Sequence, residues 1–198
     1  MTGIASSAFK GCTALSLISL NVNVTKVYPN AFYNCFSLDR LSIQTTCNSI
    51  HHFDIDLLQR ITKIALSSNV QLIEKSAFAK CTSLKSIKLP DKLEIIGESA
   101  FSECSSLSDI TIPSSVKMID SFAFMKCSSL TEIKIPPSVT QIGNAAFNGC
   151  SSLTTISIQS SVTSIGISLF DSCSKLTKAL LPQTLTEIPE YSLKSALH

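Results

Sequence analysis

Residues 100–116 read AFSECSSLSDITIPSSV, and residues 123–139 read AFMKCSSLTEIKIPPSV. The second stretch begins 23 residues after the first and keeps its alanine, phenylalanine, cysteine, leucine, isoleucine and valine positions. Self-similarity at a fixed period of this length is typical of proteins whose structural units stack along one line, each unit contacting only its neighbours. These two stretches therefore predict a repeat architecture.

The repeat extends along the whole chain. Seven of the eight cysteines lie on the 23-residue grid, at Cys12, Cys35, Cys81, Cys104, Cys127, Cys150 and Cys173. Leu58 fills the one vacant position of this column, and Ile55 fills the vacant position of a phenylalanine column three residues earlier. Because no insertion shifts the grid, we predict one solenoid over residues 1–198. Its repeats start at residues 8, 31, 54, 77, 100, 123, 146 and 169, with a divergent copy at 54 and partial coils at 1–7 and 192–198.

Each repeat contains an I-x-I pattern such as Ile110 and Ile112, which places two branched side chains on one face of a short strand. A proline ends this strand in four copies, at Pro90, Pro113, Pro136 and Pro182. Gly97, Gly143 and Gly166 mark a second bend, where we expect a backbone angle that other residues avoid. The predicted fold is a curved, right-handed stack of β-rich coils with a parallel sheet on one face and little helix.

The unit A-F-x-x-C-x-S-L-x-x-I-x-I-P-x-S-V-x-x-I-G resembles the BspA-like leucine-rich repeats, and residues 100–145 match it best. The resemblance covers nearly the whole chain and weakens at the ends and in residues 54–76. It implies a leucine-rich-repeat solenoid. Known relatives are often surface proteins of bacteria and protozoa that live on mucosal hosts, and some bind extracellular-matrix proteins. The resemblance therefore implies protein binding, by analogy and without naming a ligand.

Composition and charge describe a folded, weakly charged protein. Hydrophobic residues make up 44% of the chain and charged residues 15%, and the 16 Lys+Arg nearly balance the 14 Asp+Glu. A nucleic-acid binder usually carries a dense basic face, so we expect no nucleic-acid partner. No apolar run approaches the roughly 18 to 20 residues that cross a bilayer, and the first residues do not resemble a signal peptide. We therefore expect no membrane insertion.

The cysteine column has two readings, a disulfide framework and a column of free thiols. Cysteines that recur once per coil face the same interior and can pack as small hydrophobic side chains. Parallel Cβ vectors in neighbouring coils make disulfide geometry awkward. We therefore predict eight free thiols.

The sequence contains few signals for metal binding or catalysis. One cluster of possible metal ligands occurs, at Cys47, His51, His52, Asp54 and Asp56. Cys47 replaces an inward valine and His51 stands where other copies have glycine, so a loop without metal is the favoured reading. The only other histidine is His198, and no nucleophile signature or glycine-rich phosphate loop occurs. We predict that the protein is not an enzyme and binds no cofactor or metal.

The divergent copy at 54–76 is the most distinctive part of the predicted solenoid. Its residues 54–60 replace the usual A-F-x-x-C turn, and we expect them to form a short helix. A partner could recognise this difference.

The outward positions of the strand row are the expected binding face, because side chains alternate across a strand. This face is mostly polar and weakly basic, and its alternative reading is a solvated sheet. The candidate partner-binding residues are Arg40, Ser42, Lys63, Lys88, Thr111, Glu132, Lys134, Ser157 and Lys178.

Two functions stay open on these observations. The first is a cell-surface or secreted adhesion protein that contacts host or extracellular-matrix proteins, which the family resemblance favours. The second is an intracellular scaffold or regulator, favoured by the missing signal peptide and by thiols that need no oxidising compartment. Open coils at both ends also predict either self-association or a missing extension.

Overall fold

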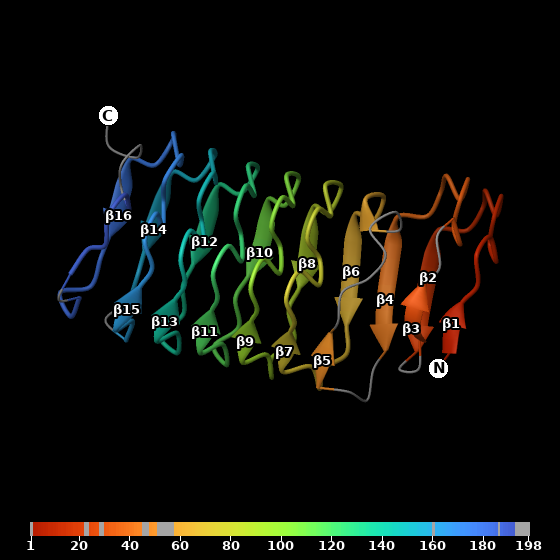
Figure 1. Cartoon of the computed structure of the whole chain (residues 1–198), viewed down its shortest axis with the longest axis horizontal. Helices are drawn as coiled ribbons and strands as arrows, with labels where there is room; N and C mark the ends of the chain where they lie inside the picture. The colour runs from red at the N-terminus through yellow and green to blue at the C-terminus, as the bar shows by residue number, and fades with distance from the viewer. Residues whose placement is uncertain are drawn as a thin grey trace.

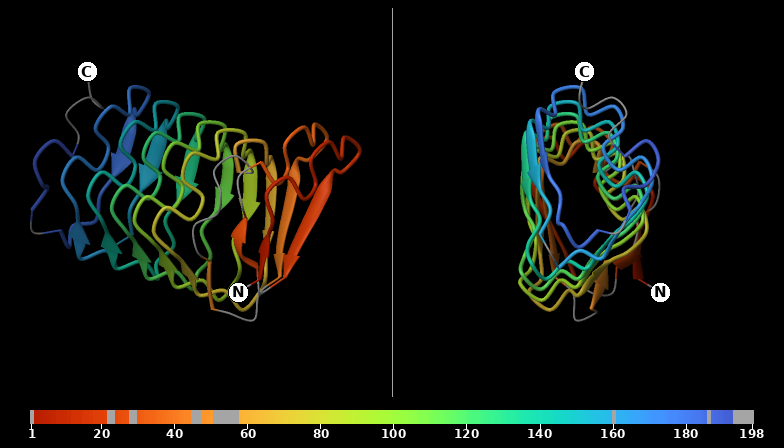
Figure 2. Two further views of the ribbon diagram at one scale, coloured as in Figure 1. Left: turned by 45° about the vertical axis from the view of Figure 1, so that its right-hand side comes forward. Right: turned by 90° about the vertical axis from the view of Figure 1, so that its left-hand side faces the viewer.

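The protein is an elongated stack of coils in which strands follow one another along a single axis (Figure 1). The computed structural model describes residues 2–21, 24–27, 30–44, 48–50, 58–159, 161–185 and 187–192. Sixteen strands lie within these ranges. Viewed end-on, the coils superimpose around one common interior (Figure 2). The predicted solenoid with parallel sheets and little helix is therefore confirmed.

One row of parallel strands runs along the whole stack. Its members are β2 (Leu17–Asn21), β4 (Arg40–Gln44), β6 (Lys63–Leu66), β8 (Ser86–Lys88), β10 (Asp109–Thr111), β12 (Glu132–Lys134), β14 (Thr155–Ser157) and β16 (Lys178–Leu180). Successive strands begin 23 residues apart, so equivalent residues lie opposite each other, as Arg40 does with Lys63. The predicted division of the chain into eight repeats is consistent with this spacing and stays a prediction.

Hydrogen bonding divides this row into two sheets. β2 to β10 form a five-stranded sheet and β12 to β16 form a three-stranded sheet. β10 and β12 remain neighbours across the break (Figure 1). Asp109 on β10 and Glu132 on β12 occupy equivalent positions there.

A second row of short parallel strands forms another wall of the coils. Its members are β5 (Ser49–Ile50), β7 (Leu72–Ile73), β9 (Ile95–Ile96), β11 (Met118–Ile119), β13 (Gln141–Ile142) and β15 (Ser164–Ile165). In the first coils, β1 (Thr2–Ile4) pairs in parallel with β3 (Val24–Val27). Two strand rows joined by short turns let each coil cover the next one on both walls.

The repeating apolar columns form one continuous core. Phe101, Phe124 and Phe147 are fully buried and stack on one another, with ring centroids 5.4 and 5.5 Å apart. The cysteine column lies beside these rings, and the Cys127 Sγ donates a hydrogen bond to the carbonyl of Phe101 at 3.2 Å. The same contact recurs at Cys104, Cys150 and Cys173. Each thiol therefore packs as a small hydrophobic group with a weak donor.

Two details of the core differ from the sequence expectations. Cys12 in the first coil is exposed, whereas the other six described cysteines are buried. The expectation of an unusual backbone angle at the glycine bends is also wrong, because Gly143 has no left-handed φ. A Cβ at Gly143 would lie 2.3 Å from the backbone nitrogen of Ser121 in the preceding coil, so glycine is needed for the close approach of two coils. Left-handed φ occurs instead at positions such as Phe122 and Lys126.

Two expectations fall outside the described ranges. The short helix expected over residues 54–60 lies mostly on residues 51–57, which are not described. The same holds for the possible metal ligands, Cys47, His51, His52, Asp54 and Asp56.

Candidate protein-binding face

The outward side chains of the first strand row form two columns, which we call the strand face. The first column contains Leu17, Arg40, Lys63, Ser86, Asp109, Glu132, Thr155 and Lys178. The second contains Ser19, Ser42, Ala65, Lys88, Thr111, Lys134, Ser157 and Leu180. The isoleucine or leucine between them points into the core, except at β16, where Ala179 holds that place. Alternation therefore separates packing from surface along the stack.

All nine predicted binding residues lie on this face. Eight are exposed, and Ser42 is half-buried. The structure brings some of them together: Arg40 lies opposite Lys63, Lys88 opposite Thr111, and Lys134 opposite Ser157. It does not unite them in one cluster, because they are spread over strands from β4 to β16. Their role in binding stays a prediction.

Interactions within the strand face are few and solvent-exposed. Arg40 donates a hydrogen bond to the Ser16 hydroxyl at 3.1 Å and lies 3.5 Å from the Asp39 carboxylate. Lys134 and Glu132 form an ion pair at 3.6 Å with both side chains largely exposed. Exposed pairs of this kind contribute little to stability, since water and salt screen them. Their charges therefore remain available to a partner.

The C-terminal part of the strand face is hollowed. A hollow of about 450 Å³ lies over β12, β14 and β16, and a second one of about 280 Å³ lies over β10 and β12. The larger hollow arises because Thr155 and Ser157 on β14 are shorter than the side chains on either side of them. We call it the trough: its floor is formed by Thr155 and Ser157, and its walls by Glu132, Lys134, Lys178 and Leu180.

Apart from the core isoleucines, three residues that line the trough are absent from the predicted binding set. Thr155 lies on its floor, Gln159 lies beyond the end of β14, and Leu180 is an outward leucine that is 51% exposed. The signal for Leu180 was present in the sequence, because an apolar residue in an outward strand position is unusual. Gln159 also had a signal in the sequence, because it follows Ser157 by two residues and strand alternation places both on one face.

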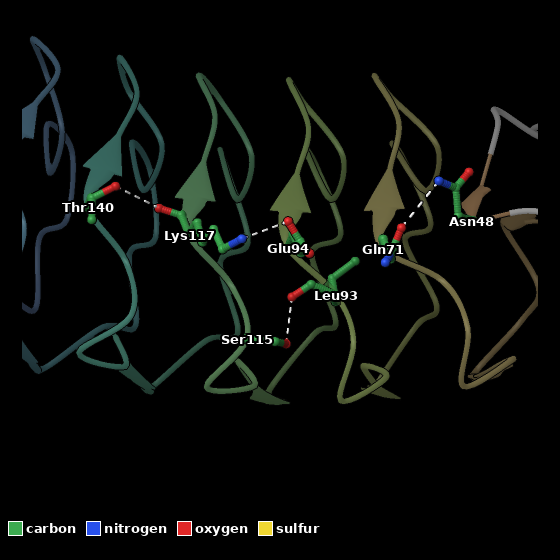
Figure 3. Close-up of polar contacts among 7 residues, drawn as sticks. All are labelled: Asn48, Gln71, Leu93, Glu94, Ser115, Lys117 and Thr140. Carbon is green, nitrogen blue, oxygen red and sulfur yellow. Dashed lines mark hydrogen bonds and ion pairs between the residues drawn. The ribbon is translucent and has the colours of Figure 1, made fainter.

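The second strand row uses its polar side chains differently (Figure 3). Asn48 donates a hydrogen bond to Gln71 at 3.3 Å, and Lys117 pairs with Glu94 at 2.9 Å. The Thr140 hydroxyl then donates to the carbonyl of Lys117. These residues satisfy one another from coil to coil. On the strand face, by contrast, Lys63, Lys88 and Lys178 take part in no ion pair among the residues that the structure describes.

The buried cysteines are poor candidates for chemistry. Burial raises the pKa of the Cys173 thiol to about 12 and holds the pKa of Cys127 well above its ordinary value. A thiol that stays protonated is neither a good nucleophile nor a good metal ligand. Within the described ranges, no three His, Cys, Asp or Glu side chains gather in a way that could hold a metal ion. None of the described segments forms a helix long and apolar enough to cross a membrane.

Known proteins similar to this chain share its repeat. A family model described as the BspA type leucine-rich repeat region matches in 6 copies, over residues 1–108 and 94–197. The crystal structure of a leucine-rich repeat protein from T. pallidum is similar at 31% identity and a TM-score of 0.63, covering 80% of this chain and 71% of that one. No curated protein sequence matches the chain.

Two further crystal structures are more distant. A leucine-rich repeat protein from Bacteroides ovatus is 23% identical, with a TM-score of 0.53, and covers 98% of this chain and 68% of that one. A leucine rich cell surface protein from Faecalibacterium prausnitzii is 24% identical, with a TM-score of 0.49, and covers 92% of this chain and 65% of that one. Likeness at this level concerns the fold alone.

Proposed function

Since this chain belongs to the BspA-type leucine-rich-repeat family, we propose that it is a non-catalytic module that binds a partner protein on its strand face. The observation that carries this proposal is the contrast between the two strand rows. Polar side chains of the second row bond to one another, whereas the strand face presents exposed charges and two hollows. Proteins of this family and fold are typically non-catalytic, and the raised thiol pKa values fit that role.

A matched pair of variants tests where the partner docks. Thr111→Trp places a bulky ring on the strand face, and Thr140→Trp places the same ring beside the second strand row, where Thr140 is also exposed. The partner is obtained by capture from a panel of soluble extracellular-matrix proteins at physiological salt. We expect Thr111→Trp to weaken binding by about tenfold or more, which is about 1.4 kcal/mol. Equal binding by the two variants would place the interface elsewhere.

We further propose that the protein acts at the cell surface or after secretion, as an adhesion protein that contacts host or extracellular-matrix proteins. The family resemblance supports this location. The alternative is an intracellular scaffold or regulator, which is supported by a column of protonated thiols that needs no oxidising compartment. Labelling intact native cells with a membrane-impermeant reagent and assaying the culture medium separates the two, because a surface protein is labelled and a secreted one is found in the medium, whereas an intracellular protein is neither while the cells stay sealed.

Self-association of the 198-residue chain is a further part of this proposal. Its terminal coils carry apolar side chains that inner coils bury, with Phe9 38% exposed and Ile188 54% exposed. Within the described strands, β2 and β16 each pair with one neighbour, so each has an open edge. End-to-end contact would cover both features. A single monomeric species in light scattering at rising protein concentration would contradict it.

A further inference from the structure

The trough over β14 has the dimensions of a site for one extended strand of polypeptide. Its two walls stand on β12 and β16, which are two strand spacings apart, or roughly 10 Å. Its floor is a single strand with two short hydroxyl side chains, Thr155 and Ser157. A segment lying above β14 would therefore have one side chain over each floor residue, since residues i and i+2 share a face.

The charges of the trough favour an anionic group. Lys178 and Lys134 stand on opposite walls, and Glu132 is the one carboxylate among its lining residues. Glu132 already lies 3.6 Å from Lys134. Lys178 takes part in no ion pair within the described part of the chain, and its side chain is exposed. Its ammonium group is therefore free to bind a carboxylate.

The floor adds two hydroxyl groups, with Thr155 beside Lys178 and Ser157 beside Leu180. Gln159 donates a hydrogen bond from Nε2 to the Ser157 Oγ at 3.4 Å. A hydroxyl that accepts one hydrogen bond still has its own proton to give, so Ser157 can donate to a backbone carbonyl of a segment above it, and the Thr155 hydroxyl can donate to a carboxylate beside Lys178. Leu180 stands opposite Lys134 across this floor and offers an apolar surface. The trough thus combines the Lys178 ammonium group, the Lys134–Glu132 ion pair, two hydroxyl groups and one apolar wall.

We propose that the trough binds an extended, acidic segment of the partner protein, with a carboxylate beside Lys178 and an apolar side chain on Leu180. The two side chains are expected at positions i and i+2 of that segment, because Lys178 and Leu180 themselves are two residues apart on one face of β16. This inference rests on the proposed function, since it assigns a ligand class to part of the strand face.

The test uses the full chain with methyl-labelled Ile, Leu and Thr residues and three synthetic peptides, followed by NMR titration. The peptides are acetyl-Leu-Ser-Glu-Ser-amide and its counterparts with Gln or Lys in place of Glu. We expect the Glu peptide to shift the Thr155 and Leu180 signals and to bind about fivefold more tightly than the Gln peptide, a typical effect of one exposed ion pair. Its affinity should fall as NaCl is raised.

Variants of the chain make the test specific. Lys178→Ala should reduce the affinity for the Glu peptide to that of the Gln peptide, and Lys178→Arg should retain it. Lys175→Ala is the matched control, because Lys175 is exposed in the same coil outside the trough. Equal binding of the Gln or Lys peptide, or full binding by Lys178→Ala, would overturn the proposal. If Thr111→Trp still weakened binding of the partner protein in that case, the proposed function would remain supported.

Discussion

Replacing Phe124 by alanine tests whether the stacked core holds the coils together. The Phe124 ring is fully buried between Phe101 and Phe147, with interplanar angles of 7° and 2°. Truncating a buried phenylalanine costs about 3 to 5 kcal/mol of unfolding free energy. We expect about 4 kcal/mol, because two neighbouring rings also lose a stacking partner worth about 0.5 to 1.5 kcal/mol each.

Phe9→Ala is the matched control, because Phe9 stacks on one ring only and remains 38% exposed. Its expected cost is about 1 to 2 kcal/mol, in proportion to the area that it buries. Urea unfolding followed by circular dichroism measures both, and the slope with denaturant reports whether the coils still unfold together. Equal losses in the two variants, or a loss below about 1.5 kcal/mol for Phe124→Ala, would refute a core that depends on stacking between coils.

Three further predictions concern the glycine bend and the thiols. Gly143→Ala should lower the free energy of unfolding by about 3 kcal/mol, because the added Cβ meets backbone atoms of the preceding coil. Gly149→Ala is the control: it has φ 71° and lies beside a flexible lysine, so it should lower the free energy of unfolding by about 1 kcal/mol. Thermal unfolding of both variants measures the difference. A thiol reagent should react with Cys12 in the native protein and with all eight cysteines only in denaturant, and four or fewer thiols without reductant would indicate disulfides. Burial raises the pKa of Cys173 from 9.0 to about 12, so its contribution to stability is complete below pH 9.0 and is lost as the pH rises towards 12. Cys173→Ala should make alkaline unfolding less steep, and an unchanged pH profile would contradict this assignment.

The coil architecture follows from the sequence because its signals are local and repeated. The alternation at Ile110 and Ile112 specifies which side of a strand is apolar, and the 23-residue spacing brings each such side onto the next. A lone coil cannot bury enough apolar surface to fold, so stacking is the remaining solution. The same alternation identified the outward residues of the strand face, including Lys134 and Lys178.

The burial of the inner cysteines could be predicted for the same reason, whereas the exposure of the first cysteine in the column could not. Cys127 is buried because coils cover it on both sides, whereas Cys12 has the same local sequence pattern and is exposed. The reason for glycine at position 143 could not be read from the sequence either, because the atoms that exclude a side chain there belong to the backbone of Ser121 in another coil.

Sequence alone determined which side chains point inward, because burial in a regular strand depends on the position within its own repeat. Tertiary structure decided which outward side chains meet: Ser157 lies on the floor of a trough only because Lys134 on β12 and Leu180 on β16, which lie on either side of it, are longer. The physical reason is the separation in sequence over which each effect acts. Hydrophobic periodicity acts between near neighbours in the chain, whereas a binding surface depends on distances between residues that folding brings together.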